Sequence, residues 1–328
     1  TGDWSSDVCS SDLATYDQLH TEHNTESGAI APPLSMQSLE LLTELAIRWR
    51  VPQFSRLVLY LDVSVQRFKD REIGLEELDA AFEMIKNPPV ESKRASSLAH
   101  AGGLQSIDRS HWTINDFALY RHTLVSVHDS LLRDLYDVLQ HCYDSKPPSV
   151  GPVMVILESH IYNDECFQQS PEQVRDYSEQ LDRGLREKAA AVYRGYLEAE
   201  VPQNQEEWQF YHVVQLGKSV VKLCTRIQKR YKKNPEFMGV NPLTVLVETM
   251  FPSFENDAAD LIQRIMNVAH ANNSEVDLQD GFDLYKELVE IRRIHQQALP
   301  GVPFAFHIED ALADFVWRWI NVADEKMV

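Results

Sequence analysis

The chain has 328 residues, of which 44% are hydrophobic and 25% charged, as in ordinary globular proteins with one or two cores. The formal net charge of −19 gives no electrostatic reason to bind DNA or RNA, and it predicts repulsion from anionic lipid except at a local basic patch. The longest apolar runs are short, such as residues 153–157, so no segment is expected to span a bilayer.

The four cysteines form neither a disulfide framework nor a zinc pattern. Cys9, Cys142, Cys166 and Cys224 contain no CxxC pair, which fits a reducing cytosol. No secretory signal peptide is recognisable at the start of the chain. We therefore expect a cytoplasmic protein without a metal ion or cofactor.

The two ends of the chain have unusual features. Residues 1–13, TGDWSSDVCSSDL, resemble a translated sequencing adapter and are excluded from the reasoning about the fold. Residues 14–34 are polar and are expected to form a flexible lead-in. The last apolar helix runs to Val328 without a stop signal, so we expect a fragment of a longer protein.

The first half of the chain is expected to be helical. A first helix begins near Ser35 and ends at Pro52. Residues 54–68 are ambiguous between strand and helix, and helix is preferred; residues 70–84 fit an amphipathic helix better than a calcium-binding hand. A loop at 87–112 precedes a helix of nearly thirty residues that ends at Cys142, and residues 151–162 form an apolar element of uncertain type.

Helices also dominate the second half. Ser170-Pro171-Glu172-Gln173 is a strong helix start, and its apolar stripe reaches Glu200. Further helices are expected at 206–231, 243–250 and 254–271, the last two separated by a break. About ten helices, several of them long, favour an all-α fold in which antiparallel helical bundles stack into an elongated rod.

Residues 284–320 form the most distinctive stretch, LYKELVEIRRIHQQALPGVPFAFHIEDALADFVWRWI. Apolar residues three, four and seven apart define a helix, Pro300-Gly301-Val302-Pro303 ends it, and a second apolar run follows that includes Val316. A second stripe on the first helix, with Phe282, Tyr285 and Val289, is either buried on both sides or left open to a partner helix.

One dense basic run stands out in the acidic chain. RIQKRYKK contains Arg226, Lys229, Arg230, Lys232 and Lys233. At a helix C-terminus these cations complement the helix dipole, and the alternative is a contact with a phosphate group of a lipid or with an acidic partner helix. No GxSxG, Walker loop, GxGxxG or HExxH motif is present, so no enzymatic activity is expected.

The wording of the last fifty residues, "YKELVEIRRI…LPGVPF" followed by "FVWRWI", resembles the first homology domain of the Munc-13 (Unc-13) family in its fungal branch. By this resemblance, residues 35–271 correspond to the helical MUN region upstream, and residues 272–328 to the truncated start of the homology domain. The family implies a rod related to vesicle-tethering complexes. In its neuronal members an asparagine and a phenylalanine that help to open syntaxin align with Phe282 and Tyr285.

The resemblance implies vesicle tethering or priming in exocytosis, with SNARE proteins such as syntaxin as partners. It also implies peripheral action at the plasma membrane or at vesicles. The alternative from the residues themselves is a generic helical scaffold in signalling or cytokinesis without SNARE contact. Further alternatives are an α-helical enzyme and direct attachment to an anionic membrane through the basic run at 226–233.

Overall fold

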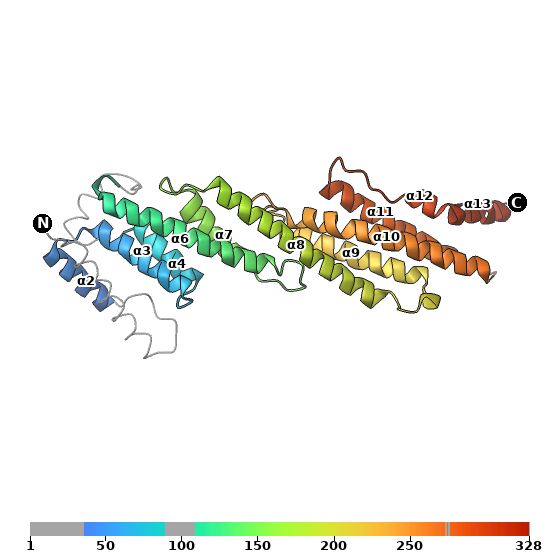
Figure 1. The fold of residues 1–328 in the computed structure, drawn as a ribbon, viewed down its shortest axis with the longest axis horizontal. Coiled ribbons are helices and arrows are strands. Elements are labelled where there is room, and N and C mark those ends of the chain that lie inside the picture. Colours follow the sequence, from blue (N-terminus) through green and yellow to red (C-terminus); the bar gives the residue numbers. More distant parts are fainter. Residues whose placement is uncertain (1–35, 89–108, 273, 275, 328) are drawn as a thin grey trace. The chain divides into compact units, whose positions relative to one another are not determined.

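A computed structural model describes residues 36–88, 109–272, 274 and 276–327 (Figure 1). Within these ranges the regular elements are helices, and the described chain forms no strand beyond an isolated bridge between Phe237 and Val240. The expected all-α class is therefore confirmed. The adapter-like segment at 1–13, the lead-in at 14–34 and most of the loop expected at 87–112 lie outside the described residues.

The chain divides into two compact units. Unit 1 consists of residues 1–135 and 149–168, and unit 2 of residues 136–148 and 169–328. This division does not follow the boundary expected at 271/272, because the helices on both sides of that boundary belong to unit 2. The domain boundaries and the rod inferred from the sequence stay predictions.

Unit 1 is built from helices of moderate length and the first part of one long helix. In chain order these are α2 (Met36–Trp49), α3 (Gln53–Lys69), α4 (Leu75–Lys86), the 3-10 turn η1 (Arg109–His111), α6 (Ile114–Leu139), α7 (Gly151–Ile156) and η2 (Leu157–Tyr162). The preference for helix at 54–68 is confirmed by α3.

A tight turn joins α3 to α4. Arg71 adopts a left-handed backbone with φ of 63° at this turn, and its guanidinium binds the Asp134 carboxylate on α6 at 2.6 and 3.1 Å. α4 then buries Leu78, Phe82 and Ile85. The amphipathic helix expected in place of a calcium-binding hand is confirmed.

The apolar element at 151–162, whose type the sequence left open, is a helix that changes its winding. α7 is α-helical, and η2, which follows without a break, is a π-helix. The wider π turn buries Leu157, His160 and Ile161 together. Such turns often occur where a helix carries a functional side chain.

Unit 2 contains the longest helices. These are α8 (Pro171–Glu200), α9 (Phe210–Arg230), α10 (Pro242–Ala271), α11 (Leu278–Ala298), α12 (Ile308–Ala311) and α13 (Ala313–Met327), with the short 3-10 turn η3 (Gln205–Glu207) before α9. The expected start of α8 is confirmed, because the Ser170 hydroxyl accepts a hydrogen bond from the Gln173 amide at 3.5 Å.

Polar contacts set the register between α8 and α10. Arg186 binds Glu248 at 2.6 Å, and further along both helices Tyr193 donates to Asp257 at 2.6 Å. Residue numbers rise together on the two helices, so α8 and α10 run in the same direction.

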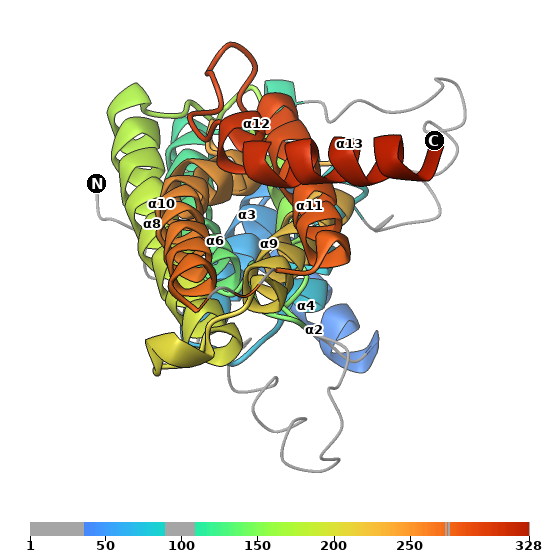
Figure 2. The same ribbon diagram turned by 90° about the vertical axis from the view of Figure 1, so that its right-hand side faces the viewer.

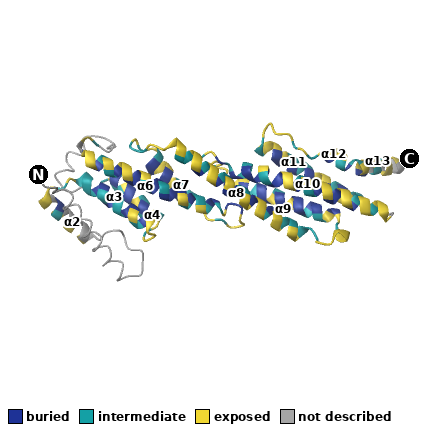
Figure 3. Ribbon diagram, in the orientation of Figure 1, coloured by how far each residue is buried: buried dark blue, intermediate teal, exposed yellow. Residues whose placement is uncertain are grey.

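A second parallel pair is formed by α9 and α11. The backbone at Gly217 approaches Glu287 and Ile291, whereas Phe210 and Gly281, earlier in each helix, both contact Phe315. Unit 2 is therefore a helical hairpin, α8–α9, stacked on a second hairpin, α10–α11. Figure 2 shows these four helices side by side, and Figure 3 shows the buried residues distributed along them.

The structure differs from the expected breaks in two places, because one expected break is absent and one unexpected break is present. α10 is one helix that continues through Pro252 where two helices were expected, because Phe251 and Phe254 are buried on either side of the exposed proline. Their burial offsets the interrupted hydrogen-bond ladder, which costs roughly 3 kcal/mol. The second apolar run is divided into α12 and α13, and Val316, expected in its apolar stripe, is 44% exposed.

None of the helices within the described ranges combines the length and the apolar character needed to cross a lipid bilayer. The most apolar faces instead lie between helices.

Close packing at Gly281 gives the first prediction. A Cβ atom at this position would lie 2.6 Å from Cδ1 and 3.0 Å from Cγ of the Phe315 ring. Gly281→Ala is expected to lower the free energy of unfolding by about 1–3 kcal/mol, because a rigid ring cannot yield like the end of a flexible side chain. Urea denaturation followed by circular dichroism measures the change.

Gly195→Ala is the matched control. Gly195 lies in α8, and a Cβ atom added there would meet no other atom within 4 Å, so alanine should raise stability by about 0.5–1 kcal/mol through helix propensity. Equal effects of the two substitutions would contradict the packing inferred between α11 and α13.

Candidate functional site

The basic run at the end of α9 separates into two groups with different surroundings. Arg226 donates to the carbonyl oxygen of Tyr143 at 3.2 Å, and Arg230 donates to that of Cys142 at 2.7 Å. Both carbonyls lie in the turns that follow α6, so these guanidinium groups satisfy backbone acceptors that the helix end leaves without amide donors.

The lysines of the run form no such hydrogen bonds to backbone carbonyls among the described residues. Lys229, Lys232 and Lys233 are exposed, and no ion pair joins them to a carboxylate in the described part of the chain. The run is thus not one continuous patch. Binding of phosphate or lipid by the basic run stays a prediction. Because its two arginines bind backbone carbonyls, Lys229, Lys232 and Lys233 are the residues left to make such a contact.

The second predicted face lies on the N-terminal half of α11. Phe282 and Val289 are half-buried and Tyr285 is 38% exposed, whereas Leu284 and Leu288 of the opposite stripe are buried. The parallel register places residue 287 level with residue 217 on α9. Residues 226–233 lie at least nine residues further along α9, about 14 Å, so the structure does not bring the two predicted sites together.

Unit 1 contains a polar cluster that sequence reasoning missed. Arg109 binds both oxygens of Asp164 at 2.6 and 3.1 Å, Tyr120 donates to the same carboxylate at 2.7 Å, and the Cys166 amide donates at 2.8 Å. The guanidinium also lies over the Trp112 ring, 5.2 Å from its centroid. This cluster joins η1, α6 and the segment after η2.

The environment fixes the charges in this cluster. Burial alone would raise the pKa of the Asp164 carboxyl, but the hydrogen bonds from Arg109 and Tyr120 outweigh it and hold that pKa below its ordinary value. Burial raises the pKa of the Cys166 thiol, although Arg109 Nη1 lies 2.9 Å from its sulfur. Cys166 is therefore held as a neutral thiol, not as a nucleophilic thiolate.

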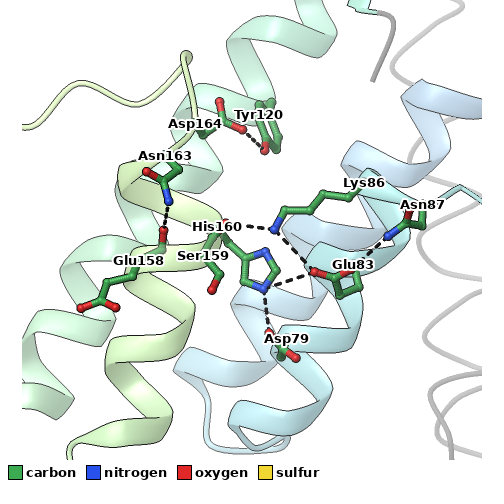
Figure 4. A network of polar contacts seen from close by, with 10 residues as sticks. All are labelled: Asp79, Glu83, Lys86, Asn87, Tyr120, Glu158, Ser159, His160, Asn163 and Asp164. Atoms are coloured by element: carbon green, nitrogen blue, oxygen red, sulfur yellow. Dashed lines mark hydrogen bonds and ion pairs between the residues drawn. The ribbon is translucent and has the colours of Figure 1, made fainter. Parts of the chain in front are cut away.

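A second network links η2 to α4 (Figure 4). The buried His160 ring stacks on Phe82 at 4.9 Å, and its Nε2 lies 2.6 Å from an Asp79 oxygen and 3.8 Å from a Glu83 oxygen. Lys86 donates to the Ser159 carbonyl oxygen at 2.9 Å, across the same junction. The network fastens the π turn to α4.

Both networks join residues far apart in the sequence. Arg109 and Asp164 are 55 residues apart, and His160 and Asp79 are 81 apart, so no local motif marks either pair. The available signals were a polar His160 within an apolar stretch and an aspartate shortly after it at 164. Both networks hold neighbouring helices together at their junctions. Within the described residues, no three His, Cys, Asp or Glu side chains are arranged to hold a metal ion.

Part of the chain matches the model of a known protein family. Residues 24–170, under half of the chain, match the model of the third TPR-like domain of the adenylate cyclase activation protein git1. The described part of this range includes both polar networks. Searches of curated proteins and of solved structures found no match.

The match corrects the family expected from the sequence. Residues 35–271 were assigned to the MUN region of the Munc-13 family, and this assignment is wrong, because their first half matches a TPR-like domain of a different family. The related description of the chain as a Munc-13-like exocytosis protein is wrong for the same reason. The resemblance rested on the sequence of one helix and the proline-rich turn after it. Unrelated helical proteins can share such short patterns of apolar and charged residues.

Removal of one arginine tests the structural role of the split basic run. Arg230→Ala leaves the Cys142 carbonyl oxygen without its charged donor, so stability is expected to fall by about 1–3 kcal/mol. Lys229→Ala, one position away and exposed, should change the free energy of unfolding by no more than about 0.5 kcal/mol. Equal losses in urea denaturation would show that Arg230 does not cap the turns after α6.

The Asp164 cluster predicts a dependence of stability on pH. Asp164→Asn should lower the free energy of unfolding near pH 7 by about 1.5–3 kcal/mol, since Arg109 loses its anionic partner. Because the folded-state pKa of Asp164 is depressed, its contribution is complete above the unfolded value of about 3.9 and is lost as pH falls through the folded-state pKa.

The free energies of unfolding of the wild type and of Asp164→Asn should therefore begin to converge below about pH 4 and become equal only below the folded-state pKa. Other carboxylates titrate in the same window, but they are common to both proteins and cancel in the difference. A difference between the two proteins that is constant from pH 7 to about pH 3 would contradict the depressed pKa.

Proposed function

We propose that the chain is a non-enzymatic helical scaffold in a signalling pathway, and that it acts by presenting helix surfaces to protein partners. The observation that carries this proposal is the match of residues 24–170 to a TPR-like domain of an adenylate cyclase activation protein. That description makes cyclic-AMP signalling the first pathway to test.

The packing of unit 2, which lies mostly outside the match, supports the same proposal. Its two hairpins are stacked with α8 parallel to α10 and α9 parallel to α11. Helical-repeat scaffolds stack helix pairs in this manner, and each added pair enlarges the surface available for binding without supplying catalytic groups. The arrangement supplies long exposed helix faces, which suit the recognition of proteins.

One exposed face in unit 1 offers a contact surface within the matched residues. Ile114 is 87% exposed and Val125 is 44% exposed, and both lie on α6. They are eleven residues apart, three turns of helix, so they occupy the same stripe, and exposed Ala118 and Arg121 lie between them. Apolar side chains held in water on one face suit contact with a partner.

Vesicle tethering with SNARE partners stays an untested prediction. It was inferred from the resemblance to the Munc-13 family, and it is not proposed further because that assignment is wrong. The role of Phe282, Tyr285 and Val289 in binding a partner helix does not require a SNARE protein, and it remains open to any helical partner.

Cyclic-AMP measurements in cells test the proposal. Deletion of the gene should lower the cyclic-AMP level, and the wild-type chain should restore it. Ile114→Arg with Val125→Arg should give a folded protein that restores little of the signal, because both positions face away from the core.

A matched control introduces two arginines at exposed positions of unit 2. Val268→Arg with Val322→Arg changes two exposed valines of unit 2 and should restore the signal fully. An unchanged cyclic-AMP level after deletion would overturn the assignment to this pathway. Full restoration by the α6 variant would exclude its exposed stripe as the contact surface.

A further inference from the structure

The outer face of α9 carries a line of lysines that form no ion pairs in the described part of the chain. Lys218, Lys222 and Lys229 are four and seven residues apart, so they point in nearly the same direction from the helix. All three are exposed, on the side opposite the buried residues of α9. Lys232 and Lys233, which are also exposed, follow the end of the helix. We call these five residues the lysine stripe.

Carboxylates do not neutralise the lysine stripe. No ion pair within 4 Å joins any of its five lysines to an acidic group among the residues described, although the chain has 50 acidic and 31 basic residues. On the neighbouring α11, Asp283 pairs within its own helix with Lys286 at 3.6 Å. Glu287 on α11 interacts electrostatically with Lys218 without forming an ion pair within 4 Å, so it offsets part of the charge of that one lysine.

Uncompensated charges on a folded surface repel one another, and a line of them along a rigid helix is a template for a line of opposite charge. The distance along α9 from Lys218 to Lys229 is about 16 Å, a length that an acidic peptide of a few turns can follow. Tyr211 lies on the same stripe, seven residues before Lys218, and is 57% exposed, which provides an aromatic contact at one end.

We propose that the lysine stripe binds an acidic segment of a partner protein, laid along the outer face of α9. A narrow peptide contacts the lysines alone, whereas a flat anionic membrane would also meet the acidic surface of a chain with net charge −19. Screening within about 8 Å lets the local positive charge act on a peptide despite the negative total. The stripe lies outside residues 24–170, so this inference does not depend on the signalling function proposed above.

Sequence reasoning identified only part of this surface. It grouped Arg226 and Arg230 with Lys229, Lys232 and Lys233 as one run. The structure assigns the two arginines to backbone carbonyls after α6 and adds two lysines from earlier turns of α9.

Binding of a designed peptide to the full chain tests the proposal. The probe is a fluorescent helical peptide of about 18 residues with glutamates three and four apart, and its counterpart has glutamine in place of every glutamate. The glutamate peptide should bind saturably, with an affinity that falls as salt rises, and the glutamine peptide should bind at least about tenfold more weakly.

Charge reversal locates the binding surface. Lys218→Glu, Lys222→Glu and Lys229→Glu together should weaken binding of the glutamate peptide by about tenfold or more. The control reverses Arg183, Lys188 and Arg194, exposed residues of α8, with the same change in net charge. The control should retain binding within about twofold. A third variant with glutamine at the three α9 positions removes the charge without reversing it, and circular dichroism checks that each variant is folded.

Three results would overturn the proposal. The first is no binding of the glutamate peptide to the wild type at low salt. The second is an equal loss in the α8 control, which would mean that only net charge matters. The third is binding of phosphatidylserine vesicles that requires the α9 lysines while the peptide does not bind, which would assign the stripe to a membrane.

Discussion

The close approach of α9 to α11 is the constraint on which the rest of unit 2 depends. Gly217 has no side chain, and this lets the Glu287 stem and the Ile291 side chain lie against the α9 backbone. With the two helices in contact, Leu216 and Val220 on α9 and Leu288 on α11 are removed from water together. Burial of such side chains contributes roughly 1.5–3 kcal/mol each, the main favourable term in a fold without strands in its described part. The same approach turns the opposite side of α9 outward, and the lysines are found there.

Each unit combines this apolar packing with a few polar contacts between distant segments. The contacts of Arg109 with Asp164 and of His160 with Asp79 lie where helix ends and a π turn expose backbone groups that need partners. Arg226 and Arg230 instead donate directly to backbone carbonyl oxygens in the turns after α6. Apolar stripes decide which helices pack, and the polar contacts decide where along each helix the packing occurs.

Helix positions were largely predictable from the sequence, and tertiary partners were not. Ser170-Pro171 marked the start of α8 because capping is a local interaction, and the apolar spacing predicted α6, α9 and α11. The break predicted at Pro252 is absent. The loss of a helix hydrogen bond at proline can be inferred from the local sequence, whereas the burial of Phe251 and Phe254 depends on other helices. The same limit explains the basic run, in which a guanidinium on a carbonyl 83 or 88 residues away has no signature in the local sequence.

The proline in α10 also affects how that helix unfolds locally. Pro252 has no amide hydrogen, so the ladder of hydrogen bonds that makes a helix cooperative is interrupted at this residue. The first part of α10 carries Glu248 and the second carries Asp257, and each part is tied separately to α8. Amide protons on the two sides are therefore expected to exchange with solvent through separate openings. α10 is one continuous helix, and it is expected to unfold locally as two segments, so strain or heat that loosens one end of the hairpin stack need not reach the other.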